Sequence, residues 1–223
     1  MGFETDIRRA VAFNLSGPIC LGISAIFCYK RNVTFNQIKI ILWALLLPLI
    51  SMVVYLVLYT PNLQEVITST GSNFAASGGF GPNQVATVLG IGIFVLAVRF
   101  FMSKELFFHK FFDLILLALL GFRALVTFSR GGVITAIIMI LFFLALYYLK
   151  VNLKTKFRIK FSMIIFLIIV GVTWFISSIE TSGFLDKRYA NQDAAGREKE
   201  DITTGRTDLL AFEFSAFLDN PFL

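Results

Sequence analysis

Most of the chain alternates between long apolar blocks and short polar segments. The blocks are rich in Leu, Ile, Val and Phe, and each is close to the ~20 residues that a helix needs to cross a bilayer core of roughly 30 Å. They are too long for the alternating strands of an outer-membrane barrel. We therefore expect an all-α polytopic membrane protein whose bundle occupies residues 1–179. Its about six transmembrane helices are predicted near residues 11–29, 40–59, 85–102, 111–129, 132–149 and 161–179.

The first block is the weakest of the predicted spans. Asn14, Ser16, Gly17 and Pro18 interrupt its apolar run. Proline removes a backbone donor and disturbs the helix around it, so we expect this span to be broken or tilted.

Residues 180–223 are polar and carry charges of both signs. Within them, residues 203–218 predict a short amphipathic helix that has Arg206 in its first turn and that Pro221 stops. We expect this helix to lie against the membrane surface. The segment is expected to be the start of an extracytoplasmic loop that is cut short, and the chain a piece of a longer protein.

Composition agrees with a membrane protein and argues against nucleic acid as a partner. Hydrophobic residues make up 57% of the chain and charged residues 15%. The net charge of +6 arises from short clusters between apolar blocks and not from one basic stripe. Cys20 and Cys28 both lie in the first block, which suggests neither a disulfide nor a metal site. We expect no metal and no cofactor.

The distribution of Lys and Arg between alternate loops predicts the orientation. Residues 30–39 contain three, 103–110 two and 150–160 five, against none in 60–84 and one in 129–132. Positive loops stay on the cytoplasmic side. We therefore expect three segments to face outward: residues 60–84, 129–132 and 180–223.

Charged residues inside the predicted spans are candidates for function. On a continuous helix, Arg123, Thr127 and Arg130 would share one face. A buried arginine is costly in a membrane and usually faces the bundle interior or a water-filled cavity. For Arg123, snorkelling to the surface or pairing with a carboxylate is the alternative. Arg99 is expected to be a snorkelling anchor.

Arg130, Gly131 and Gly132 stand at the start of the fifth predicted span. Free backbone N–H groups and the positive end of a helix dipole would meet the guanidinium there, which outlines an anion site. An interfacial turn with arginine as a headgroup anchor explains the same residues. The glycine-rich segment 77–83 lacks the ending of a phosphate-binding loop and predicts a turn.

Three motifs together resemble the O-antigen ligase and polysaccharide polymerase family of bacterial membrane glycosyltransferases. They are Thr127-Phe-Ser-Arg-Gly-Gly132, Gly205-Arg-Thr-Asp-Leu-Leu210 and Phe217-Leu-Asp-Asn-Pro-Phe-Leu223. The resemblance covers roughly residues 75–223. It implies a multi-pass protein of the cytoplasmic (inner) membrane.

The resemblance also implies an activity and residues that carry it. Members move a glycan from an undecaprenyl-diphosphate carrier to an acceptor outside the cytoplasmic membrane, without a metal ion. Arg130 and Arg206 match the two functional arginines of the family, and Arg206 belongs to an Arg-x-x-x-Leu pattern that ends at Leu210. We expect both to be catalytic and to bind the diphosphate. Arg123 as an auxiliary contact is our own inference, and the acceptor stays unidentified.

The chain departs from the family in one respect. The family places a histidine downstream of the Arg-x-x-x-Leu pattern as candidate base, whereas the only histidine here is His109, on the expected cytoplasmic side. We therefore expect the base beyond Leu223 and no activity from these residues alone. Two other functions stay open: a transporter or flippase for an anionic solute or lipid, and a receptor or scaffold subunit.

Overall fold

The computed structural model describes residues 3–102, 107–199 and 205–219, and within them every regular element is helical. The predicted all-α class is therefore confirmed. The helices in chain order are α1 (Phe3–Cys28), α2 (Phe35–Tyr59), α3 (Leu63–Val66), the 3-10 turn η1 (Ala75–Ser77), α4 (Pro82–Met102), α5 (Phe107–Val126), α6 (Arg130–Lys150), α7 (Leu153–Glu180), α8 (Phe184–Tyr189) and α9 (Arg206–Asp219).

Among the described residues, five helical stretches are long and apolar enough to cross a membrane. They contain α1, α2, α4, α6 and α7, which confirms a multi-pass membrane protein. The fourth predicted span, α5, is not among the five. It is also long, with 20 residues, but it carries Lys110, Asp113 and Arg123.

The chain divides into two compact units, Met1–Trp43 and Ala44–Leu223. In the first unit, α1 contains Pro18 within its bounds and continues to Cys28. The helix is therefore not broken at this proline, and the tilt that we gave as the other possibility stays a prediction.

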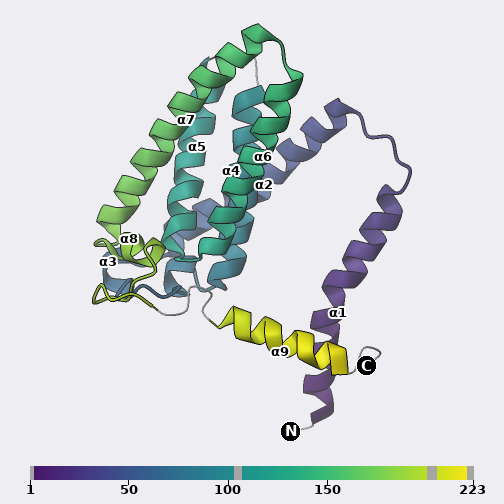
Figure 1. Cartoon of the computed structure of the whole chain (residues 1–223), viewed down its shortest axis with the longest axis vertical. Coiled ribbons are helices and arrows are strands. Elements are labelled where there is room, and N and C mark those ends of the chain that lie inside the picture. The colour runs from purple at the N-terminus through teal and green to yellow at the C-terminus, as the bar shows by residue number, and fades with distance from the viewer. Residues whose placement is uncertain (1–2, 103–106, 200–204, 220–223) are drawn as a thin grey trace. The chain divides into compact units, whose positions relative to one another are not determined.

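In the second unit, α4 is the most buried of the long helices and packs against both α5 and α6 (Figure 1). Small residues allow the close approach of α4 and α6. A Cβ atom added to Gly132 would lie 2.4 Å from the carbonyl oxygen of Ala86, and one added to Gly90 would lie 2.7 Å from the oxygen of Gly132. Backbones meet this closely only where side chains are absent. The first turn of α6 is thereby fixed on α4.

The segment between α2 and α4 packs on the end of α5. Ile67 and Ala76 form a small apolar cluster with Val126 and Phe128. Gly78 follows η1 with a left-handed φ of 67°, which is the turn expected in the glycine-rich segment. This part of the chain therefore covers the turn between α5 and α6.

Candidate functional site

The turn between α5 and α6 brings the first candidate residues together, but not on one helix. α5 ends at Val126, Phe128 has a left-handed φ of 58°, and Arg130 is the first residue of α6. The prediction that Arg123, Thr127 and Arg130 share one helix face is therefore wrong. The chain reverses between the two arginines, and Arg130 belongs to the next helix.

Buried hydroxyl groups hold this turn in place. Thr127 Oγ1 donates to the carbonyl of Ala124 at 2.7 Å and accepts from the backbone N–H of Ser129 at 3.2 Å. Ser129 Oγ lies 2.8 Å from Oδ1 of Asn83, in the first turn of α4. A left-handed phenylalanine is costly, and these bonds offset that cost. The turn is thus attached to α4 through both Asn83 and the packing of Gly132.

The two glycines after Arg130 have different surroundings. Gly132 is buried against the backbone of α4, whereas nothing lies within 4 Å of a Cβ placed on Gly131. Gly132 therefore positions the helix start, and Gly131 leaves open space beside Arg130. Their predicted part in binding a substrate stays a prediction.

Arg188 joins this turn, and the sequence did not single it out. Its Nε donates to the carbonyl of Phe128 at 3.1 Å, while Nη1 of Arg130 donates to the backbone carbonyl of Arg188 at 3.4 Å. Each guanidinium group therefore bonds to a backbone carbonyl at or near the other arginine. In the sequence, Arg188 stands beside Lys187 in a short polar run, and spacing alone does not distinguish the two cations.

The short helix α8 carries Arg188 and is fixed to the end of α7. Asp186 accepts hydrogen bonds from Trp174 Nε1 at 2.9 Å and from the hydroxyl of Ser178. The ring of Tyr189 packs edge-on against Trp174, with 4.8 Å between the centroids. α7 thus determines where Arg188 meets the turn.

The electrostatics of α8 indicate a concentration of positive charge. Burial lowers the pKa of Arg188, and the charges of Arg130 and Arg206 lower it further. Burial raises the pKa of Tyr189 to about 12, against the opposing effect of the two nearby arginines, so its phenol is neutral near pH 7. The charges of Arg130 and Arg206 thus both act on Arg188, and such a concentration of guanidinium charge favours an anion that carries more than one charge.

Arg206 and Leu210 lie in α9, as the sequence predicts. Arg206 is the first residue of this helix, and all side chains of α9 are exposed. The expected stop at Pro221 and the start of the predicted helix at 203–204 lie outside the described residues, as do the last residues of the third motif. The expected contact of α9 with the membrane surface stays a prediction.

Arg123 is 6% exposed and faces the interior of the second unit. Its Nη2 donates to the carbonyl of Leu56 at 2.6 Å, but Nε and Nη1 have no hydrogen-bond partner among the described residues. Arg123 therefore neither snorkels nor pairs with a described carboxylate. Arg99, which we expected to snorkel, instead forms a 3.0 Å ion pair with the buried Asp113 of α5.

Residues 115–223 match the protein-family model described as O-antigen ligase. No curated protein and no solved structure matches the chain. The matched range contains the α5–α6 turn, α8 and α9, and with them Arg123, Arg130, Arg188 and Arg206. In the part of the chain that the structure describes, no group of three or more His, Cys, Asp or Glu residues could hold a metal ion.

Proposed function

We propose, from the match of residues 115–223 to the O-antigen ligase family model, that the chain acts as a member of this family and binds a glycan carried on undecaprenyl diphosphate. The glycan would be transferred to an acceptor outside the cytoplasmic membrane. The observation that carries the proposal is the contact of Arg130 with Arg188 at the end of the bundle where α6 begins, where the charge of Arg206 also acts on Arg188.

Three arginines suit a diphosphate for a chemical reason. In the transfer, the bond between the anomeric carbon of the glycan and a phosphate oxygen breaks, and the acceptor hydroxyl oxygen forms the new bond. Negative charge grows on the departing diphosphate, and planar guanidinium groups stabilise such charge through paired hydrogen bonds. Arg130 and Arg206 are the proposed catalytic residues, and Gly131 leaves room for the phosphate beside α6.

The cation Arg188 is proposed to hold Arg130 in position and to share the diphosphate charge. Its backbone carbonyl accepts from Arg130, so a shift of α8 would move the Arg130 side chain. The base that takes the proton of the acceptor hydroxyl is not assigned. His109 lies in the first turn of α5, at the end of that helix opposite the α5–α6 turn.

One observation favours a second candidate function. The guanidinium of Arg123 is buried with two nitrogens that lack partners among the described residues, as in a path for an anion through a bundle. A transporter or flippase for an anionic solute or lipid would use such a residue. This alternative requires passage across the membrane, whereas the transferase requires only binding at one end.

The test compares donor binding by the purified full chain with binding by three variants, Arg130→Ala, Arg188→Ala and Arg206→Ala. A charge-assisted hydrogen bond contributes ~1.5–3 kcal/mol, so each variant should bind an undecaprenyl-diphosphate-linked glycan about tenfold more weakly or worse. Arg197→Ala is the matched control, because Arg197 is 81% exposed and pairs with its own neighbour Asp193. Equal binding by all four variants and the wild type would refute the proposed site.

A liposome experiment separates the two functions. If the chain is a transferase, the wild type should move no labelled lipid diphosphate across the bilayer. Arg123→Ala should then cause no change in transport. Transport by the wild type that Arg123→Ala abolishes would favour the transporter instead.

A further inference from the structure

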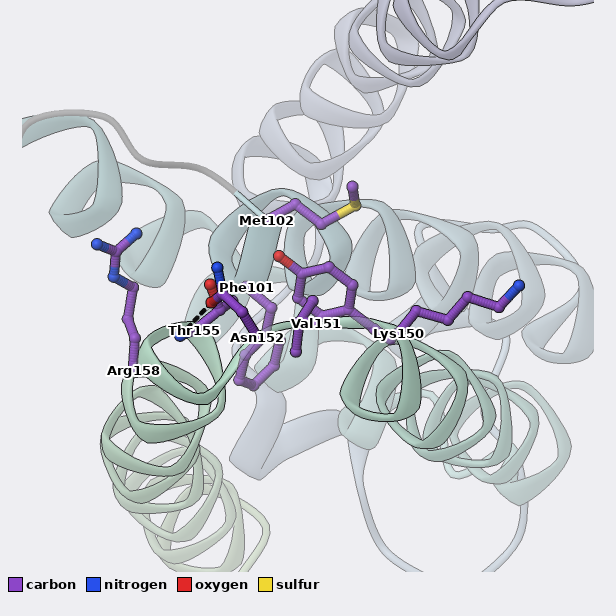
Figure 2. A pocket seen from close by; sticks show the side chains of 8 residues that line it. Phe101, Met102, Lys150, Val151, Asn152, Thr155 and Arg158 are labelled. Carbon is purple, nitrogen blue, oxygen red and sulfur yellow. Dashed lines mark hydrogen bonds between the residues drawn. The ribbon is translucent and has the colours of Figure 1, made fainter.

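A pocket lies at the end of the bundle opposite the arginine site. Arg130 begins α6 and Lys150 ends it, so the two ends are separated by the length of a 21-residue helix, roughly 30 Å. The pocket has a volume of about 400 Å³ and lies among the end of α4, the end of α6 and the start of α7 (Figure 2). Its lining includes Phe101, Met102, Lys150, Asn152, Thr155 and Arg158.

The surroundings of the pocket are strongly positive. Residues 150–160 contain five cations and no acid, and two of the five, Lys150 and Arg158, line the pocket. The charge of Arg158 also acts on Lys110 of α5. The nearby carboxylate of Asp113 is engaged in its ion pair with Arg99. The pocket therefore has an excess of positive charge that an anion can neutralise.

Polar and apolar groups occupy different parts of this pocket. Asn152 caps α7 by accepting from the backbone N–H of Thr155 at 3.0 Å, which directs the positive end of the α7 dipole to this region. Figure 2 shows Lys150 and Arg158 on opposite sides of the Asn152–Thr155 pair. Phe101 and Met102 add apolar surface. Such a lining matches a molecule with an anionic head and an apolar remainder.

The position along the helices supports the same ligand. Lys150 and Leu153 stand at the ends of two stretches that are long and apolar enough to span a membrane, which is where phospholipid headgroups lie. Leu149, Leu153 and Phe157 are 75%, 83% and 77% exposed, so apolar side chains beside the pocket are open to acyl chains.

We propose that this pocket binds the headgroup of an anionic phospholipid, with its phosphate at the Asn152–Thr155 start of α7 and the charges of Lys150 and Arg158 on either side of it (Figure 2). The acyl chains lie along the exposed apolar side chains at the ends of α6 and α7. The site is separate from the proposed glycan-donor site, since it lies at the other end of α6.

The experiment measures lipid retained by the full chain purified from mixed bilayers of phosphatidylglycerol and phosphatidylethanolamine. We expect the wild type to retain phosphatidylglycerol preferentially. The double variant Lys150→Gln/Arg158→Gln should lose this preference, by about fivefold for each cation removed. The matched control is Lys154→Gln/Lys160→Gln, which removes the same charge from exposed residues that do not line the pocket.

Equal loss in the two double variants would overturn the proposal, because general surface charge and not the pocket would then hold the lipid. Equal retention of both lipids by the wild type would overturn it as well. Inorganic phosphate that displaces phosphatidylglycerol at comparable concentration would assign the pocket to free phosphate instead.

A measurement on the wild type keeps the proposal testable if the double variant fails to fold. A photoreactive phosphatidylglycerol analogue should crosslink to peptides that contain residues 147–158, and unlabelled phosphatidylglycerol should suppress the crosslink. Crosslinking spread evenly over all exposed helices would contradict the proposal. Glycan-donor binding should be unchanged in the pocket variants, so failure of this proposal is distinguishable from failure of the proposed function.

Discussion

Arg123 shows at the scale of one side chain how a charge is kept inside the bundle. Only one of its guanidinium nitrogens has a hydrogen bond among the described residues, to the carbonyl of Leu56. Buried charges without an opposite charge are destabilising, and replacing buried ionic groups with apolar ones is often neutral or stabilising. Arg123 is therefore retained at a cost to stability.

Arg123→Met should raise the stability of the fold by ~1 kcal/mol or more, because methionine fills similar volume without burying charge. The midpoint of thermal unfolding in detergent measures this change. Leu125→Met is a suitable control, since it replaces a neighbouring buried side chain of α5 without altering charge. A lower midpoint for Arg123→Met than for the control would show that the arginine contributes net stability.

The two glycines after Arg130 give a matched pair of substitutions. In Gly132→Ala the new Cβ would lie 2.4 Å from backbone atoms of Ala86, so α6 must move. We therefore expect the free energy of unfolding to fall by ~1–3 kcal/mol. In Gly131→Ala the new Cβ meets nothing within 4 Å, so the free energy of unfolding should rise by ~0.5–1 kcal/mol. Thermal unfolding followed by the fluorescence of the two tryptophans distinguishes them. Similar shifts in both variants would mean that the α4–α6 contact does not set the stability.

At the scale of elements, much of the bundle could be predicted because the membrane imposes a simple rule. A segment of ~20 apolar residues must satisfy its backbone hydrogen bonds internally, so block length alone predicts the long helices. The hairpin at Arg130 followed from glycines between two such blocks. The break expected at Pro18 did not occur, since proline inside a membrane helix is tolerated.

The sequence could not predict the contacts that join distant elements. Arg188 reaches the turn through a backbone carbonyl, and no side-chain pattern marks a carbonyl acceptor. The pairing of Arg99 with Asp113 depends on which faces of α4 and α5 meet, which the apolar pattern leaves open. The end of α5 at Val126 depends on the left-handed Phe128, a residue type that rarely adopts this conformation.

The attachment of α8 to α7 can be tested by removing Asp186. Asp186→Ala leaves the indole N–H of Trp174 and the Ser178 hydroxyl without their acceptor. We expect the free energy of unfolding to fall by ~1–3 kcal/mol. We also expect trypsin to cleave faster after Lys187 and Arg188. Cleavage is measured in detergent under native conditions.

Asp208→Ala serves as the control for this prediction, because Asp208 is an exposed residue of α9 and its loss removes the same charge. Cleavage at an unchanged rate in Asp186→Ala would show that α8 is held mainly by other contacts.

At the scale of the whole molecule, the predicted orientation is open to direct measurement. In a background with Cys20→Ser and Cys28→Ser, a cysteine at the exposed Ser72 and one at the exposed Lys154 should lie on opposite sides of the membrane. A membrane-impermeant maleimide should label Ser72→Cys in intact cells and Lys154→Cys only after permeabilisation, because positive loops stay in the cytoplasm. Labelling of both from the same side would refute the topology.

The contacts of the arginine site also determine when it can form during synthesis. The bond from Arg188 to Phe128 joins residues 60 positions apart. Chains emerge from the ribosome amino terminus first. The turn at Phe128, and then α6 and α7, are therefore synthesised before Arg188, which contacts the turn. The site is completed only after these helices have been translated, so a chain truncated before residue 188 lacks the contacts of Arg188 with the turn.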